Sequence, residues 1–290
     1  MTAGNRDSGF GNRNSQSEGA AVSDAFSSPE SRFPNPASGI GLLVIGDELL
    51  SGKRTDKHLP HVIGLLAARG IGLSWAQFLG DDEQQIAAAI AQARDRGDAL
   101  LSCGGIGATP DDCTRQAAAR AFGVPLQPHA GAVALIEAEY GERARPNRVL
   151  MAHFPQGAGL IPNPVNRVAG FSIGNCYFVP GFPEMAWPML EWVLDQPLRG
   201  LHRADPPVEF SLRALGSSSE GDLLELMEGT LREFPAVKLS SLPYRGDGSR
   251  PRHIEFGIKG PQAQAAAAFR WFRQHLALRQ DLSIEDLRIP

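Results

Sequence analysis

The chain has 290 residues, enough for one large domain or two of modest size. Hydrophobic residues make up 42% of it and charged residues 21%, as in an ordinary globular protein. The formal net charge of -4 gives no electrostatic reason to expect nucleic acid binding, and the apolar runs are too short to cross a bilayer. We therefore expect neither nucleic acid nor a membrane as a partner.

Residues 1–38 are rich in Ser, Gly, Asn and Pro and have hardly any branched aliphatic residues. Such a segment cannot bury enough apolar surface to offset its chain entropy, so it predicts a disordered tail, and it lacks the apolar stretch of a signal peptide. The three cysteines, Cys103, Cys113 and Cys176, show no metal-type spacing. We expect a cytoplasmic protein without a structural disulfide.

The first elements along the chain alternate between strand and helix patterns. The β-branched, apolar run Ile40–Ile45 predicts a buried strand. Asp56 is positioned to cap a helix whose apolar spacing continues to Ala67. Residues 73–79 predict a second strand, and a helix with one apolar face follows the acidic stretch at 80–83.

The third strand pattern, Ala99–Leu101, runs into a glycine-rich loop, Gly104–Gly107, and then a helix that extends to Phe122. The β-α-β-α-β-α order predicts a parallel sheet with right-handed crossovers and helices on both faces. A strand, a glycine loop and a helix start together make a binding site for an anion. The alternative is an ordinary strand-to-helix turn with a good cap.

Acidic pairs follow three of these predicted strands: Asp47-Glu48, Asp81-Asp82 and Asp111-Asp112. Ligands of parallel sheets bind at the carboxyl ends of the strands, where these pairs would meet at one edge. Carboxylates beside a phosphate indicate Mg²⁺-assisted chemistry, because they would otherwise repel it. The alternative is that each acidic residue caps the helix after it.

The second half of this region predicts a helix over 129–140, an irregular segment over 142–164 and a hairpin that turns near Gly174-Asn175. A rigid turn, Pro180-Gly181-Phe182-Pro183-Glu184, leads into a helix ending at Leu194.

A change of composition at Arg203–Pro207 predicts a linker. The β-α-β-β-α pattern beyond it predicts a small α+β domain over 205–280. Its expected elements are strands at 208–215, 237–242 and 253–258 and helices at 219–234 and 261–278. Residues 281–290 are assigned as a tail, with a packed extension as the open alternative.

Three ordered motifs carry a family likeness: GDELLSG at 46–52, GGIGATPDDCTR at 104–115 and PGFPEM at 180–185. They resemble the molybdopterin-binding family of MoaB and Mog proteins, and within it the branch that forms the N-terminal domain of the competence/damage-inducible protein CinA. The resemblance implies a three-layer α/β/α domain over 39–200, oligomeric, that binds a phosphate-bearing pterin or dinucleotide. The segment beyond 205 is similar to the small domain that follows in the CinA branch.

The resemblance also implies roles for individual residues. Asp112 matches the aspartate of Mog-type proteins at the molybdenum insertion chemistry, and Asp81 is the second candidate catalytic acid. Asp112 and Asp47 are the candidate ligands for Mg²⁺ or another divalent metal. The implied ligand-binding residues are Gly46, Asp47, Glu48, Ser51, Gly52, Gly104, Gly105, Gly107, Thr109, Thr114, Pro180 and Gly181.

One segment departs from the CinA pattern. CinA-type proteins usually carry Thr-Asn where this chain has Lys57-His58, and Asp56-Lys57 is instead similar to Mog-type proteins. His58 is a candidate phosphate donor in place of the lost amide. His58 and His61 lie one helical turn apart, a spacing that two metal ligands can share, but a solvated helix face is the expected arrangement.

Three functions follow from these observations. The first, which we favour, is a molybdopterin- or nucleotide-binding protein. The second is a metal-dependent nucleotide pyrophosphatase acting on ADP-ribose or FAD, an activity that the CinA likeness implies. The third is a non-catalytic regulatory module whose small domain contacts a protein partner. No amidohydrolase pattern follows the small domain, so we do not expect deamidase activity.

Overall fold

The computed structural model describes residues 37–216 and 218–289, so all but the last two residues of the disordered tail expected over 1–38 lie outside the described part of the chain. The main division between two compact units falls between Leu201 and His202, near the change of composition at 203–207. Each unit has a sheet and a core of its own.

The first unit is built on a six-stranded sheet in the order β2-β1-β3-β8-β7-β6. Strands β2, β1, β3 and β8 are parallel, and β7 and β6 continue the sheet in antiparallel pairs. The strands are β1 (Ile40–Ile45), β2 (Trp75–Leu79), β3 (Ala99–Cys103), β6 (Gly159–Ile161), β7 (Gly170–Ile173) and β8 (Cys176–Val179).

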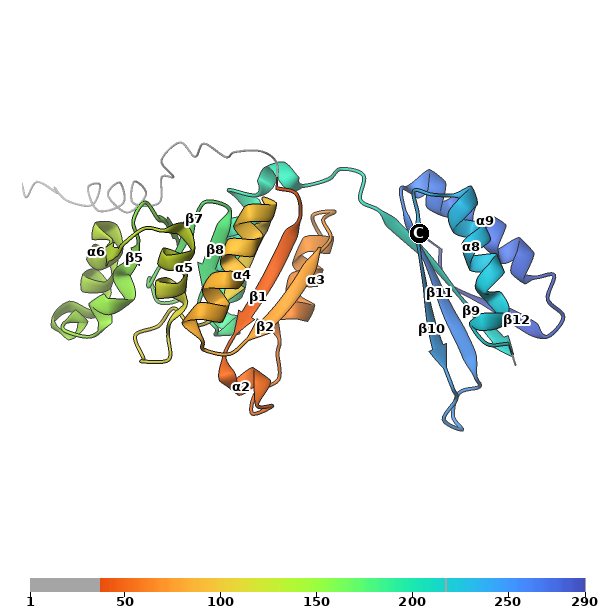
Figure 1. Ribbon diagram of the computed structural model, residues 1–290, viewed down its shortest axis with the longest axis horizontal. Coiled ribbons are helices and arrows are strands. Elements are labelled where there is room, and N and C mark those ends of the chain that lie inside the picture. Colours follow the sequence, from red (N-terminus) through yellow and green to blue (C-terminus); the bar gives the residue numbers. More distant parts are fainter. Residues whose placement is uncertain (1–36, 217, 290) are drawn as a thin grey trace, which may run out of the picture. The chain divides into compact units, whose positions relative to one another are not determined.

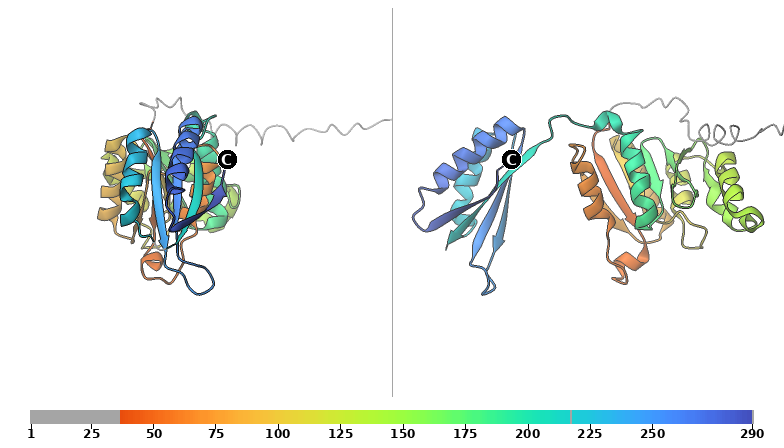
Figure 2. Two further views of the ribbon diagram at one scale, coloured as in Figure 1. Left: turned by 90° about the vertical axis from the view of Figure 1, so that its right-hand side faces the viewer. Right: turned by 180° about the vertical axis from the view of Figure 1, so that it is seen from behind.

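Helices cover both faces of this sheet. Figures 1 and 2 show α4 and α5 on one face and α3 and α7 on the other. The helices are α2 (Asp47–Leu50), α3 (His58–Ala67), α4 (Glu83–Arg96), α5 (Thr114–Phe122), α6 (Ala130–Tyr140) and α7 (Pro183–Asp195). The predicted three-layer α/β/α architecture with a mostly parallel sheet is therefore confirmed.

The core explains why the central strands are uniformly apolar. Every residue of β1 and β3 is buried, because both faces of a parallel sheet are covered by helices. Ile86, Ile90 and Ala93 of α4 pack against one face of this sheet together with Ala117 and Ala118 of α5. The alanines of α5 let it pack closely against α4.

Two local predictions are confirmed in detail. The Asp56 carboxylate accepts hydrogen bonds from the N–H groups of His58 (2.8 Å) and Leu59 (3.0 Å), and so caps the start of α3. The β7–β8 hairpin pairs Ile173 with Cys176 across a two-residue turn at Gly174-Asn175.

The irregular segment predicted for 142–164 is only partly irregular. It contains short 3-10 turns at Gly141–Ala144 and Arg148–Ala152 and the strands β5 (His153–Pro155) and β6. Strand β5 pairs with β4 (Leu126–Pro128), which the sequence did not reveal because each strand has three residues. These pieces place Met151 and Asn163 beside the glycine loop.

The second unit is a four-stranded antiparallel sheet in the order β10-β11-β9-β12, with two helices packed on one face. Its elements are β9 (Val208–Gly216), α8 (Leu224–Glu233), β10 (Lys238–Tyr244), β11 (His253–Gly260), α9 (Gln262–Leu276) and β12 (Leu282–Arg288). The assignment of 281–290 as a tail is wrong for most of the segment. Strand β12 pairs with β9, and Leu282 and Ile284 pack against the core, so the packed extension is the arrangement found.

In the described part of the chain, no helix has the length and apolarity needed to span a bilayer. Cys103 and Cys176 are buried and Cys113 is half-buried. Burial raises the pKa of all three thiols, that of Cys113 to about 11, so each is held in the unreactive protonated form at neutral pH.

Candidate functional site

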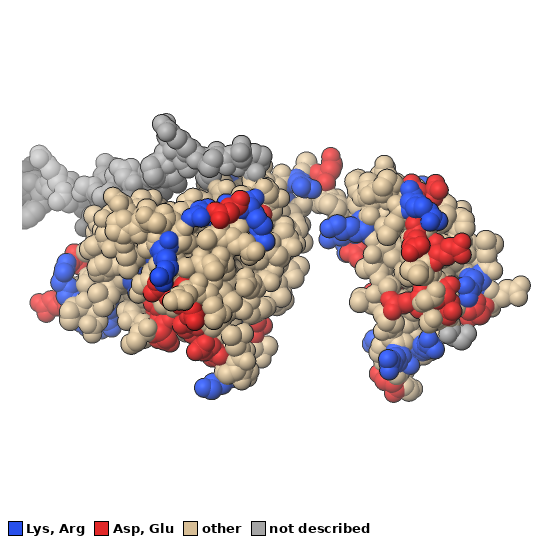
Figure 3. Space-filling model, viewed as in Figure 1, with Lys and Arg blue, Asp and Glu red and all other residues tan. Residues whose placement is uncertain are grey.

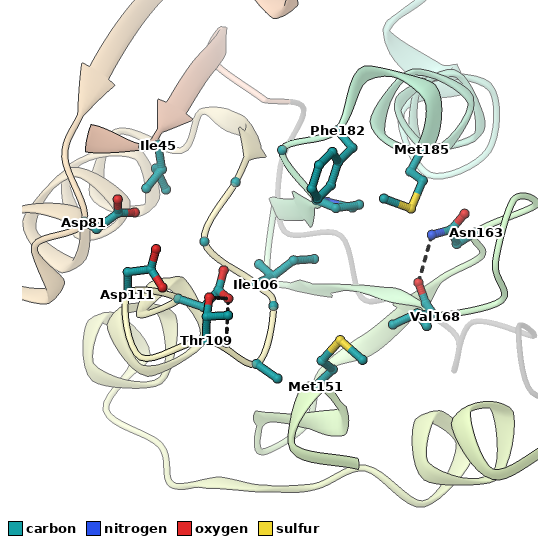
Figure 4. Close-up of a pocket in the computed structure, with 18 of the residues that line it drawn as sticks. Ile45, Asp81, Ile106, Thr109, Asp111, Met151, Asn163, Val168, Phe182 and Met185 are labelled. Atoms are coloured by element: carbon teal, nitrogen blue, oxygen red, sulfur yellow. Dashed lines mark hydrogen bonds between the residues drawn. The ribbon is translucent and has the colours of Figure 1, made fainter. Parts of the chain in front are cut away.

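A cavity of about 480 Å³ opens at the carboxyl ends of β1, β3 and β8. Its floor is the glycine loop, Gly104 to Gly107, and its walls come from the turn after β1, the turn after β8 and the segment around Asn163. The cavity has two different ends (Figure 4). Asp81 and Asp111 lie at one end, and Met151, Met185 and Val168 lie at the other.

The glycine loop needs glycine at its first two positions. Gly104 has φ +109°, and a Cβ there would lie 2.3 Å from the carbonyl oxygen of Ile45. Gly105 has φ +68°, and a Cβ there would lie 2.2 Å from Oγ1 of Thr114. Because no side chain intervenes, the loop backbone forms the cavity floor itself, which is the arrangement that brings N–H groups against a phosphate.

Two buried side chains of α5 hold this loop from below. The hydroxyl of Thr114 donates a 3.0 Å hydrogen bond to the carbonyl of Gly104. The guanidinium of Arg115 donates to the carbonyls of Gly107 (2.6 Å) and Leu150. Burial lowers the pKa of Arg115, and the nearby Asp112 opposes this shift. Thr114 has the supporting position expected of it, whereas Arg115 was not predicted.

Replacing Arg115 with methionine is expected to lower the free energy of unfolding by about 2–4 kcal/mol, because the carbonyls of Gly107 and Leu150 lose their buried donor. Arg120→Met is the matched control on the same helix. Arg120 pairs with Glu83 at 3.2 Å on the surface, so its loss should cost less than about 0.5 kcal/mol. Urea denaturation measures both, and equal losses would show that Arg115 does not hold the loop.

The acidic pairs at the strand ends divide into helix caps and cavity residues. The Asp82 carboxylate accepts hydrogen bonds from the N–H groups of Gln84 (2.9 Å) and Gln85 (3.0 Å) and caps α4. Asp81 instead lines the cavity, and its carboxylate accepts a 3.0 Å hydrogen bond from the N–H of Asp47. The Asp47 carboxylate in turn accepts from the N–H of Asp81 (3.2 Å).

This exchange places several carboxylates close together. Burial raises the pKa of Asp81, and the charges of Asp47, Glu48 and Asp111 add to the increase, while the hydrogen bond from Asp47 opposes it. Acidic side chains also gather on the surface around α2 and the start of α4 (Figure 3). A carboxyl group with a raised pKa at a cavity wall can accept or release a proton at higher pH than an ordinary aspartate.

Asp112 lies in the cavity wall but is engaged by the loop. One oxygen of its carboxylate accepts hydrogen bonds from both the N–H (2.9 Å) and the hydroxyl of Thr109. The same oxygen lies 2.4 Å from where a Cβ of Gly107 would be, so the carboxylate packs against the loop backbone. Asp112 therefore shapes the loop.

The fit of the cavity to a divalent cation follows from these positions. Among the residues that the structure describes, no group of three or more His, Cys, Asp or Glu side chains is arranged to hold a metal ion. Mg²⁺ is often bound by one or two carboxylates together with substrate phosphates. Asp81 and Asp111 line the same end of the cavity, and two carboxylates are enough for a cation of that kind.

A family model described as a probable molybdopterin binding domain matches residues 41–200, more than half of the chain. The chain belongs to this family. The match covers nearly all of the six-stranded unit, including every residue of the glycine loop and the residues at both ends of the cavity. It ends just before the boundary of the second unit.

Relatives with similar sequences are CinA-like proteins. That of Citrifermentans bemidjiense is 34% identical over 209 residues, which are 69% of this chain and 50% of the relative. That of Anaeromyxobacter dehalogenans is 30% identical over 237 residues, 79% of this chain and 57% of the relative. The chain thus spans about half the length of these curated relatives.

Solved structures resemble the first unit. The protein CinA of unknown function from Thermoplasma acidophilum has 27% identity and a TM-score of 0.50, and the match covers 54% of this chain and 96% of that one. The molybdopterin biosynthesis enzyme MoaB from Thermus thermophilus has 22% identity and a TM-score of 0.38, covering 56% and 92%. The predicted membership of the molybdopterin-binding family and the resemblance to CinA proteins are confirmed by the family model, the CinA-like relatives and the CinA structure.

Most of the residues that the resemblance implied are brought together. Ser51 and Gly52 are exceptions, because they lie in the exposed turn after α2 and do not line the cavity. Asp47 and Thr114 do not line the cavity themselves. Asp47 hydrogen-bonds Asp81, and Thr114 hydrogen-bonds Gly104, and both of these partners line it. The predicted residues that line the cavity are Gly46, Glu48, Asp81, Gly104, Gly105, Gly107, Thr109, Asp112, Pro180 and Gly181.

A solvated face for His58 and His61 is wrong. His58 is 5% exposed, and its Nε2 lies 3.1 Å from the carbonyl oxygen of Gly181. The ring of His61 stacks on Trp187 of α7 with centroids 3.8 Å apart, and burial lowers the pKa of His61. His58 therefore contacts the turn before α7, and His61 contacts α7 itself.

Proposed function

We propose that the chain binds a phosphate-bearing pterin or dinucleotide in the glycine-loop cavity. The observation that carries the proposal is the bare backbone of Gly104 and Gly105, which forms the cavity floor at the carboxyl ends of the central parallel strands. Family membership supports it, since the matched domain is described as probably binding molybdopterin.

The shape of the cavity supports a ligand with one charged and one apolar part. The glycine loop and the carboxylates of Asp81 and Asp111 suit a phosphate with an accompanying Mg²⁺ ion. Met151 and Met185 at the other end suit a ring or another apolar group. A volume of about 480 Å³ is in the range of small-molecule sites.

Isothermal titration calorimetry with Mg²⁺ present tests the proposal. ADP-ribose, FAD and a phosphorylated pterin are each compared with a phosphate-free counterpart, namely adenosine, riboflavin and the unphosphorylated pterin. At least one phosphate-bearing ligand should bind about tenfold or more tightly than its counterpart, because its phosphate forms charge-assisted hydrogen bonds that the counterpart lacks. Equal affinities, or no binding of any ligand, would contradict it.

A second candidate function is a metal-dependent nucleotide pyrophosphatase, and Asp81 is the observation that favours it. Its carboxyl group lines the cavity, does not cap α4 as that of Asp82 does, and has a raised pKa. In such a reaction water attacks a phosphorus atom and the bridging oxygen leaves with the other phosphate. Asp81 would accept the proton of that water, while the cation stabilises the charge on the phosphates.

A further inference from the structure

The lining of the glycine-loop cavity is acidic and carries one cationic side chain. Its carboxylates are those of Glu48, Asp81, Asp111 and Asp112, and among the described residues that line the cavity Arg54 is the only Lys or Arg. Because carboxylates repel an anion, a phosphate on the glycine loop needs positive charge beside it. Arg54 is the protein's own source of that charge within this lining.

The backbone of Arg54 is fixed, whereas its guanidinium is loosely held. The N–H of Arg54 donates a 3.0 Å hydrogen bond to the carbonyl of Glu48 in the turn after α2. Its Nη1 makes one contact with Oε1 of Glu48, at 3.4 Å, and the two side chains are 53% and 42% exposed. An exposed ion pair of this kind contributes little to stability, so the guanidinium can leave Glu48 readily.

The ring of Phe182 gives the guanidinium a second contact at the cavity wall. The centre of the guanidinium lies 5.9 Å from the centroid of this ring, within the range of a cation–π interaction. Phe182 is itself 50% exposed and lines the cavity from the turn before α7 (Figure 4). This contact does not use the N–H groups of the guanidinium, so they stay free to donate to an anion.

A phosphate and the Glu48 carboxylate would compete for the same guanidinium. Arg54 and Glu48 both line the cavity, so an oxygen of a ligand there can reach the pair. A guanidinium can donate two parallel hydrogen bonds to a phosphate, and these are stronger than its single 3.4 Å contact with Glu48. His58, the phosphate donor suggested by the sequence, does not line this cavity, and its Nε2 lies 3.1 Å from the carbonyl oxygen of Gly181.

On the basis of the proposed function, we propose that Arg54 exchanges Glu48 for the phosphate of the ligand. The exchange selects phosphate-bearing ligands in a cavity whose other charged lining residues are acidic. Arg54 is then a specificity-determining residue, which binds the anionic part of the ligand and not its ring.

Three substitutions at the pair test the exchange. Arg54→Met removes the charge and keeps a long apolar chain beside Phe182. Arg54→Lys keeps the charge but loses the planar fork that donates two parallel hydrogen bonds. Glu48→Gln removes the competing charge and leaves Arg54 in place. Thermal melts establish that the variants fold.

Arg94→Met is the matched control. Arg94 also pairs with a carboxylate, that of Asp95 at 2.8 Å, and also lies over an aromatic ring, that of Phe122 at 5.7 Å. Its side chain is 40% exposed, and it does not line the cavity. The control therefore loses the same kinds of contact and the same charge at a place that the ligand does not reach.

Calorimetry on the full chain at a fixed Mg²⁺ concentration uses inorganic pyrophosphate, ADP-ribose, FAD and a phosphorylated pterin as probes. We expect Arg54→Met to weaken the probes that bind by about tenfold or more, and Arg54→Lys to weaken them by about threefold. Arg94→Met should change them less than about twofold. Glu48→Gln should tighten pyrophosphate binding by about threefold, because Arg54 no longer has to leave a carboxylate.

Other outcomes overturn the inference. If Glu48→Gln weakens pyrophosphate binding as Arg54→Met does, the intact pair is what matters, and Arg54 only holds the turn after α2 in place. If Arg54→Met has no larger effect than Arg94→Met, Arg54 does not bind the phosphate. If the unaltered protein binds none of the probes, the proposed function itself fails, which is a different result from the first two.

Discussion

Alanine in place of Gly104 is expected to abolish ligand binding and to lower the free energy of unfolding by about 2–4 kcal/mol. The residue has φ +109°, and its Cβ would lie 2.3 Å from the carbonyl oxygen of Ile45. That oxygen belongs to the backbone of β1 and cannot rotate away, so the loop itself must move. Calorimetry with the tightest phosphate-bearing ligand and urea denaturation measure the two effects.

Gly123→Ala is the matched control for this substitution. Gly123 ends α5 with φ +66°, and nothing lies within 4 Å of where its Cβ would be. Alanine there should lower the free energy of unfolding by only about 1 kcal/mol, because an L-residue is disfavoured in a left-handed backbone conformation, and it should leave ligand binding unchanged. If Gly104→Ala bound ligand as Gly123→Ala does, the glycine loop would not be the floor of a ligand site.

Asparagine in place of Asp81 is expected to reduce any metal-dependent hydrolysis of ADP-ribose or FAD by about 100-fold or more, while binding is retained. The amide oxygen can still accept the hydrogen bond from the N–H of Asp47, so the wall of the cavity is preserved. The amide cannot take a proton from water. Release of AMP, assayed with Mg²⁺, Mn²⁺ or Co²⁺, measures the loss.

Asp82→Asn is the neighbouring control, because Asp82 caps α4 and does not line the cavity. It should keep full turnover. Equal turnover in the Asp81 and Asp82 variants would exclude Asp81 as the base. If the unaltered chain releases no AMP but still binds the ligands, it is a binding protein rather than a pyrophosphatase.

The pH profile gives a second test of Asp81. The group must be ionised to accept a proton, so turnover falls as the pH drops through its pKa. Burial and the neighbouring carboxylates raise that pKa in the metal-free protein, whereas a bound cation lowers it, so the acidic limb should move to lower pH as the Mg²⁺ concentration is increased. At a fixed, low Mg²⁺ concentration, removing the charge of Asp111 with Asp111→Asn lowers the pKa of Asp81 and should also move the limb to lower pH. An unchanged limb would assign it to another group.

The sequence was sufficient for features that depend on neighbouring residues. The apolar run at 40–45, the Asp56 cap and the turn at Gly174-Asn175 each reflect local backbone preferences, and each lies where predicted. The order of strands and helices was enough to predict the parallel sheet, because βαβ crossovers have a fixed hand. The glycine loop followed from the same local reasoning.

Features that depend on distant residues could not be predicted. Arg115 hydrogen-bonds the carbonyl of Leu150, which is 35 residues away in the sequence, and His58 contacts Gly181, which is 123 residues away. Short strands such as β4 and β5 have too few residues for a periodic pattern, so Met151 was not expected at the cavity. The sequence could not distinguish strand β12 from a tail, because the strand is defined by its pairing with β9, which is distant in the sequence.

The most direct test of the central claim is a crystal structure of the protein grown with ADP-ribose or a phosphorylated pterin. We predict that phosphate oxygens lie within about 3 Å of backbone N–H groups between Gly105 and Ala108, the distance of an ordinary hydrogen bond. A ligand whose phosphates lie away from this loop, or one bound outside the glycine-loop cavity, would contradict the assignment of the glycine loop as the phosphate site.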